Sequence, residues 1–139
     1  MAAGDLPEPV RALLDTNVLI RHLTGDPPGQ AARSTAFLRG RHELLLPDLI
    51  VAETVYVLGS VYGRPPGEVV AAVGSLLALP LVFVSDPPLL LRALELYGSS
   101  KLDFPEAYLA ATAERSGVGR VASFDQALDA VPTIVRVEP

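Results

Sequence analysis

The stretch Leu13-Leu14-Asp15-Thr16-Asn17-Val18-Leu19-Ile20 decides the fold. Residues 10–14, apolar except for Arg11, predict a short strand, and residues 16–23 predict a helix that begins directly after it. Asp15 therefore follows the carboxyl end of a strand, which is where ligands bind in an open parallel sheet. Asp is also a preferred N-cap residue, so a purely structural role at the start of the helix stays open.

The alternation of strands and helices continues to the end of the chain. We expect further strands at residues 44–47, 81–84, 121–124 and 133–137, and helices at residues 29–38, 48–62, 65–79, 86–97, 103–115 and 126–130. Asp48 and Asp86 are expected to cap the helices that begin at residues 48 and 86. Short strands that are apolar on both faces suit a parallel sheet covered by helices. The sequence predicts one three-layer α/β/α domain over residues 1–139, with a mostly parallel sheet of four or five strands and a short arm at residues 1–9.

Length and composition exclude several classes of protein. The chain has 139 residues, which suits one domain, and 16 acidic against 11 basic residues give a net charge of −5. It contains no cysteine, which excludes a disulfide framework and a thiolate nucleophile, and two histidines argue against a multi-histidine metal site. Acidic charge argues against a broad nucleic-acid surface but leaves room for a local one.

The distribution of apolar residues predicts the cellular compartment and the presence of contact surfaces. No apolar run is long enough for a membrane span, and the N-terminus lacks the basic and apolar stretches of a signal peptide, so we expect a cytoplasmic protein with no membrane partner. The mean hydropathy of +0.37 is high for one domain. It predicts either a large core or apolar surface covered by a partner. We expect a homodimer with further apolar helical surface available to a partner protein, and residues 55–62 and 69–79 to line these surfaces.

Other carboxylates also interrupt apolar sequence. Glu53 lies within a helix that is apolar on nearly all sides, which predicts either a buried acid that faces a cation or an acid on a narrow exposed stripe. Asp103 and Glu106 share one face at the start of a helix, where one of them can be only a cap; the alanines that follow favour Glu106 as the inward acid. Asp125 follows a strand, and capping is again the alternative.

Two smaller polar residues accompany these acids. Asn17 is placed to orient a water or a phosphate, and Ser123 to donate a hydrogen bond to a carboxylate or a phosphate. Each can instead bond the local backbone, which is the commoner case for Ser. Four basic residues lie near motif ends or in loops: Arg21, Arg39, Arg41 and Lys101. Arginine binds phosphate in a bidentate manner, so these side chains can contact a phosphate. They can equally be solvated surface residues without a ligand.

A parallel sheet would gather the acids at one edge. Carboxylates about 4 Å apart repel each other by about 4 kcal/mol at an effective dielectric of about 20, so such a cluster needs a cation or raised pKa values. Oxygen ligands without Cys or His indicate Mg²⁺ or Mn²⁺. Acid clusters that hold these ions cleave phosphodiesters, because the ion binds a phosphate oxygen, activates water and stabilises the leaving oxygen.

The four acidic motifs together resemble the PIN-domain ribonucleases and, in size, the VapC-type toxins of toxin–antitoxin pairs. Leu-Leu-Asp15-Thr-Asn-Val-Leu-Ile is similar to the first family motif, Ala-Glu53-Thr-Val-Tyr to the second, Glu106-Ala-Tyr-Leu-Ala-Ala to the third, and Ser-Phe-Asp125 to the fourth. Two positions depart from the family pattern: Glu106 stands where Asp is commoner, and Ser123 stands where Thr is usual.

The resemblance implies an Mg²⁺- or Mn²⁺-dependent endoribonuclease that acts on RNA, forms a homodimer and is inhibited by a cognate antitoxin protein. Asp15, Glu53, Glu106, Asp125 and Asp103 would form the catalytic site, with Asn17 and Ser123 at the substrate. The metal ligands would be Asp15 and either Glu106 or Asp103. The main alternative is a catalytically silent PIN-like module that binds RNA or protein. A phosphoryl-transfer domain is a third alternative, and two residues argue against it. The dehalogenase type would need Asp at position 17, where this chain has Asn. The receiver type would need a lysine near the end of a late strand, whereas the only lysine, Lys101, precedes a helix.

Overall fold

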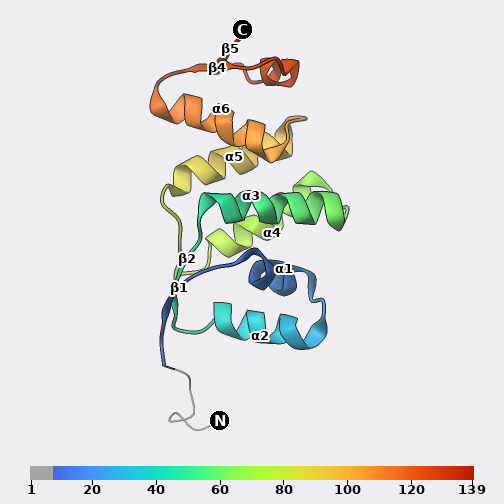
Figure 1. Cartoon of the computed structure of the whole chain (residues 1–139), viewed down its shortest axis with the longest axis vertical. Coiled ribbons are helices and arrows are strands. Elements are labelled where there is room, and N and C mark those ends of the chain that lie inside the picture. Colours follow the sequence, from blue (N-terminus) through green and yellow to red (C-terminus); the bar gives the residue numbers. More distant parts are fainter. Residues whose placement is uncertain (1–7) are drawn as a thin grey trace.

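The computed structural model describes residues 8–139, and strands and helices alternate through it (Figure 1). The strands are β1 (Arg11–Leu13), β2 (Glu43–Leu45), β3 (Val82–Phe83), β4 (Arg120–Ala122) and β5 (Val135–Val137). The helices are α1 (Thr16–Thr24), α2 (Pro28–Leu38), α3 (Asp48–Tyr56), α4 (Pro66–Leu77), α5 (Pro87–Ser99) and α6 (Phe104–Ser116), with a π-helical turn η2 (Val57–Val61) and a 3₁₀ turn η3 (Gln126–Ala130). Residues 1–7 of the predicted N-terminal arm lie outside the described residues.

All the strands pair in parallel, which confirms the α/β class. In one ladder β2 lies between β1 and β3, with Arg11 opposite Glu43 and Leu44 opposite Val82. In the other, β4 pairs with β5, with Arg120 opposite Val135.

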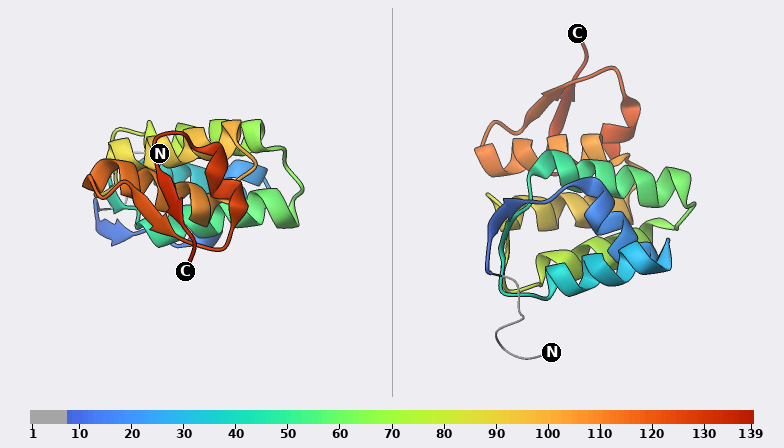
Figure 2. Two further views of the ribbon diagram at one scale, coloured as in Figure 1. Left: turned by 90° about the horizontal axis from the view of Figure 1, so that it is seen from above. Right: turned by 60° about the horizontal axis from the view of Figure 1, so that its bottom comes forward.

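The strands form two ladders instead of the single sheet that the sequence predicts. The β4–β5 ladder lies beyond α6 at one end of the long axis, and β1 and β2 lie on the other side of α3 (Figures 1 and 2). Each strand has only two or three residues, so few ladder hydrogen bonds hold the sheet together and helix packing sets the arrangement.

The core lies between the helices. Its fully buried side chains are mainly leucine and valine, and the largest include Leu19, Leu44, Leu58, Leu76, Leu90, Leu128, Val51, Val55, Val69 and Val73. Buried alanines of α6, among them Ala107 and Ala110, let this helix pack closely against α5. Within residues 8–139, none of the helices has the length and apolar character needed to cross a bilayer.

The predicted helix over residues 48–62 is continuous but changes its hydrogen bonding halfway. After Tyr56 the chain takes π-helical turns, and the Tyr62 N–H donates to the Val57 carbonyl five residues back at 3.0 Å. The N-cap of α3 is Pro47, so the expectation that Asp48 caps this helix is wrong. By contrast, Asp86 caps α5 as predicted, because its side chain accepts the Leu89 N–H at 3.3 Å.

Candidate functional site

Asp15 joins β1 to α1 and is exposed. It occupies the N-cap position in an extended conformation, with φ −92° and ψ 152°, yet its side chain accepts no capping hydrogen bond. The capping alternative therefore does not apply to this residue. Its carboxylate is available to a ligand, and the exposed side chain of Asn17 lies in the first turn of the same helix.

Glu53 lies on α3 and meets the start of α1. The Thr16 hydroxyl donates to a carboxylate oxygen of Glu53 at 2.7 Å, and Thr16 itself is buried. Of the two alternatives for Glu53, the buried acid is wrong and the exposed stripe is confirmed, because α3 buries Val51, Thr54 and Val55 and leaves Glu53 exposed. A single hydroxyl and water suffice to solvate this carboxylate, so it needs no cation to be tolerated.

Glu106 and Asp125 form a second acidic pair, between the first turn of α6 and the loop after β4. Glu106 is half-buried, and its side chain hydrogen-bonds to that of Asp125. This hydrogen bond, with burial, raises the pKa of Glu106, and the same bond, with the Ala127 N–H, lowers the pKa of Asp125. The two shifts run in opposite directions, so of the two carboxyl groups Glu106, the more buried partner, takes up a proton more readily than Asp125.

The caps that the sequence left open are present at this second pair. A Glu106 carboxylate oxygen accepts the Asp103 N–H at 3.2 Å, which is one arm of a capping box at the start of α6, and Asp103 is exposed. Asp125 accepts the Ala127 N–H at 2.9 Å and so caps the η3 turn. The Ser123 hydroxyl accepts the Asp125 N–H at 2.9 Å, which is the local backbone contact.

The acids fall into two pairs: Thr16 links Glu53 to Asp15, its neighbour in the chain, and Glu106 faces Asp125. Within residues 8–139, no group of three or more Asp, Glu or His side chains is placed to hold a metal ion together. The sheet is divided between the two pairs, because Asp15 follows a strand of the first ladder, whereas Asp125 follows a strand of the second.

A buried link between α3 and α6 was missed by the sequence analysis. The Tyr108 hydroxyl donates to one carboxylate oxygen of Asp48 at 2.6 Å, and the other oxygen of Asp48 is buried without a partner. The hydrogen bond to Asp48, with burial, raises the pKa of Tyr108 to about 12. Asp48 precedes Glu53 on α3 and Tyr108 follows Glu106 on α6, so this bond ties together the two helices that carry one acid of each pair.

The donor set fits a hard divalent cation. The side chains at both pairs offer carboxylate and hydroxyl oxygens, the ligands that Mg²⁺ and Mn²⁺ prefer. At the second pair the contact between two carboxyl groups raises the pKa of Glu106, and a cation bound there would relieve the repulsion between their charged forms. Glu106, Asp103 and Asp125 on one side, and Asp15 and Glu53 on the other, are the residues that would hold or surround such an ion.

Comparison with known proteins identifies the family. The model of the PIN domain matches residues 12–134, which span every motif described above. No curated protein sequence matches the chain significantly. The family consists typically of metal-dependent nucleases that bind Mg²⁺. The chain belongs to the PIN domain family.

Proposed function

We propose that this protein is a Mg²⁺- or Mn²⁺-dependent endoribonuclease and the toxin of a toxin–antitoxin pair. The observation that carries the proposal is the Asp15 carboxylate, which stands exposed at the end of β1, in the first motif of a PIN domain, without the capping bond that its position invites. The second observation is the pair of touching carboxyl groups, Glu106 and Asp125, on the elements that carry the third and fourth motifs.

In this proposal some acids bind the ion directly and others act through water. Asp15 and either Glu106 or Asp103 would hold the ion directly, whereas Glu53 and Asp125 would accept hydrogen bonds from the waters around it. A bound Mg²⁺ or Mn²⁺ would supply Lewis-acid chemistry at the scissile phosphate. A carboxylate must be deprotonated to act as a ligand, and the pKa of Glu106 is raised by the contact with Asp125 and by burial, so metal binding is expected to weaken as the pH falls.

The test is cleavage of RNA by purified protein with Mn²⁺, compared with Asp15→Asn and Glu53→Gln. Each substitution should reduce the cleavage rate by at least about 100-fold while the melting temperature stays near that of the parent. Glu68→Gln is the matched control, because Glu68 is an exposed acid in the first turn of α4. If Asp15→Asn cleaves as fast as the parent, the nuclease proposal fails.

The homodimer and the antitoxin belong to the same proposal. Large apolar side chains are exposed along α3 and η2: Leu49 is 69% exposed, Tyr56 66% and Val61 69%. Within residues 69–79, by contrast, Val69, Val73 and Leu76 belong to the core and cannot contact a partner. We propose that a second copy and the antitoxin cover the α3–η2 surface. Light scattering of the Tyr56→Ser, Val61→Ser variant should show a shift from dimer to monomer; a parent protein that is monomeric at high concentration would contradict it.

The silent PIN-like module is the second candidate, and one observation favours it. Within the described chain the acids stand as two pairs and not as a group that encloses one ion. Calorimetric titration with Mn²⁺ separates the two candidates, because a nuclease must bind the ion and a silent module need not. Absence of binding together with absence of cleavage would favour the module.

A further inference from the structure

The helical hairpin formed by α1 and α2 carries positive charge in an acidic protein. Residues 16–41 contain Arg21, Arg33, Arg39 and Arg41 but only one acid, Asp26, so their net charge is +3, whereas the whole chain has −5. The two helices pack against each other, which brings the arginines onto one unit of the fold (Figure 1). A local basic surface on an acidic protein attracts a polyanion to one place.

Most arginines elsewhere in the chain are paired, whereas those of the hairpin are not. Outside the hairpin, Arg11, Arg92, Arg115 and Arg136 each form an ion pair with Asp or Glu, and Arg64 and Arg120 form none with a carboxylate of residues 8–139. None of the four hairpin arginines forms an ion pair with a carboxylate of residues 8–139. The paired arginines link elements of the fold through ion pairs, whereas the charges of the hairpin arginines are available to an external anion.

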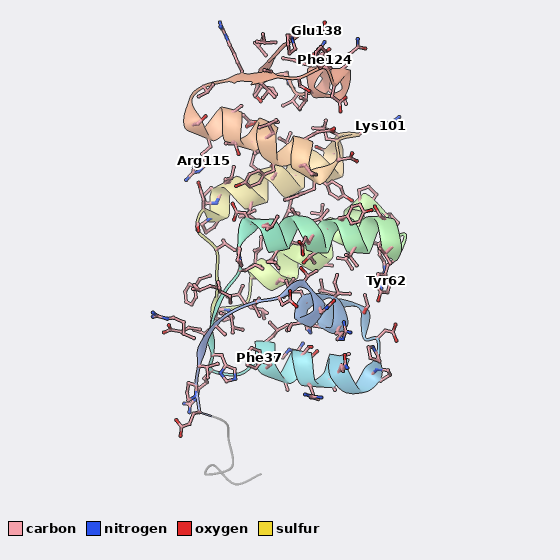
Figure 3. All side chains as sticks on the ribbon, in the orientation of Figure 1. Phe37, Tyr62, Lys101, Arg115, Phe124 and Glu138 are labelled. Atoms are coloured by element: carbon pink, nitrogen blue, oxygen red, sulfur yellow. The ribbon has the colours of Figure 1, made fainter. Side chains whose placement is uncertain are left out.

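A pocket on this hairpin has the groups that bind a phosphodiester chain. It has a volume of about 380 Å³ and is lined by Arg21, Gln30, Arg33, Ser34 and Phe37. The Arg21 guanidinium donates to the Gln30 side-chain oxygen, which orients its remaining N–H groups without neutralising them. Phe37, labelled in Figure 3, stacks on the ring of buried His42 with centroids 4.4 Å apart, so the aromatic wall of the pocket is fixed.

The pocket is close to the first acidic pair along the chain. Helix α1 begins directly after Asp15, and Arg21 stands six residues further on, about 9 Å along the helix axis. Arg39 follows the last residue of α2 and is exposed, and the two helices are joined through the His22–Thr35 side-chain hydrogen bond of 2.7 Å. An RNA strand that passes Asp15 would meet these arginines within a few nucleotides.

We propose that the α1–α2 hairpin binds the backbone phosphates of single-stranded RNA beside the cleavage site, with Arg21, Arg33 and Arg39 as the phosphate ligands. The proposal deepens the nuclease function and rests on it for the identity of the polyanion. Single-stranded RNA fits the pocket better than an acidic peptide does, because guanidinium groups stand beside an aromatic side chain, and bases stack on such side chains while arginines bind the backbone.

The experiment measures RNA binding without cleavage. Fluorescence anisotropy of a labelled single-stranded RNA in EDTA gives Kd over a range of salt concentrations for the parent and for the Arg33→Gln, Arg39→Gln variant. Both residues are exposed, so the fold should survive, and the melting temperature checks this. We expect Kd to rise about 10-fold and the slope of log Kd against log salt to fall by about 0.7 for each lost contact.

Two further variants serve as controls. Arg64→Gln, Arg120→Gln removes the same charge from outside the hairpin and should change Kd less than about two-fold, since it removes no phosphate contact. Arg33→Lys, Arg39→Lys keeps the charge and should keep most of the salt slope. A loss of binding in the hairpin variant that the Lys variant restores would support a phosphate surface and exclude a folding defect.

Three results would overturn the proposal. The first is equal RNA binding by the hairpin variant and the Arg64, Arg120 control. The second is loss of binding to a polyglutamate peptide without loss of binding to RNA, which would assign the surface to an acidic protein. The third is a parent protein that does not bind RNA at all. Failure of the nuclease function is distinguishable from these results. A parent protein that binds RNA through the hairpin in EDTA but does not cleave it with Mn²⁺ would support the RNA-binding surface and contradict the nuclease function.

Discussion

The two acidic pairs contain the same chemical groups but differ in exposure and in the groups that contact them. Glu53 is exposed and accepts one hydrogen bond from the Thr16 hydroxyl, so its carboxylate is solvated and held in place. Glu106 is half-buried against a second acid, Asp125, and this contact with burial raises its pKa. The carboxylate of Glu53 therefore has a hydroxyl donor beside it, whereas that of Glu106 has a second acid beside it, whose repulsion a bound cation would relieve.

The largest expected effect is on activity, where the two pairs should behave alike. Glu53→Gln and Glu106→Gln should each lower RNA cleavage by at least about 100-fold, because both remove a carboxylate from the proposed metal environment. Melting temperatures at pH 7 in EDTA should then separate the pairs: Glu106→Gln should raise the melting temperature, because Gln imitates the protonated acid, and Glu53→Gln should leave it unchanged. A lower melting temperature for Glu106→Gln would contradict the proton-sharing pair.

The next effect concerns the link between the helices that carry the pairs. Tyr108→Phe removes the donor to Asp48 and leaves both carboxylate oxygens without a protein partner, which should lower the free energy of unfolding by about 2 kcal/mol. Urea unfolding measures this change. Tyr56→Phe is the control, since Tyr56 is 66% exposed on α3, the helix of Asp48, and the unfolding free energy of this variant should stay within about 0.5 kcal/mol of the parent.

A smaller effect is expected at the first pair. Thr16→Val keeps the shape of a buried side chain and removes the hydroxyl that donates to Glu53. Because Glu53 is exposed and water can replace the hydroxyl, the free energy of unfolding should fall by only about 0.5 kcal/mol. Cleavage should fall more than stability does, because the carboxylate loses its fixed position. Parent-like cleavage by this variant would show that the hydroxyl does not orient Glu53.

The smallest effect is a change of stability with pH in the metal-free protein. The pKa of Glu106 is raised in the folded state, so its stabilising contribution is complete below its ordinary value of 4.5 and is lost as the pH rises through the raised value. Asp125, with a lowered pKa, contributes above its ordinary value of 3.8 and loses that contribution only in stronger acid.

Between about pH 4.5 and 7, Glu106 therefore favours the folded state at the acid end. Urea unfolding in EDTA at pH 5 and pH 7 should show a pH-dependent gain for the parent that Glu106→Gln lacks. The same gain in both proteins would place its origin elsewhere in the chain.

Sequence reasoning succeeded where the determinants are local. Helix α1 and its start after Asp15 follow from a strand that ends at a polar residue, and α2 begins at Pro28, one residue before its predicted start. The Asp86 cap and the η3 turn also follow from residues within one turn. In the candidate site, periodicity and spacing located all four acids on strand ends or helices, because carboxylates that interrupt apolar sequence are few.

The features that sequence reasoning missed depend on contacts between distant residues. The Tyr108–Asp48 hydrogen bond joins residues 60 apart, and Asp48 was expected to be a cap because Asp at the start of a helix is typical of one. The exposure of Glu53 depends on which side of α3 the neighbouring helices cover, and apolar residues on nearly every side of α3 hide that direction. The division of the sheet depends on whether β1 and β4 pair, and strands of three residues carry too little pattern to decide it.

The parallel registers also bear on the order in which the chain folds. Arg11 pairs with Glu43 across 32 residues, whereas Arg120 pairs with Val135 across only 15. Closing the longer loop costs about 0.7 kcal/mol more in free energy, because more chain entropy is lost. The β4–β5 ladder can therefore form before β1 pairs with β2. The Asp15 end of the molecule would then be assembled last, and backbone amides of β1 and β2 should exchange with solvent faster than those of β4 and β5 during refolding.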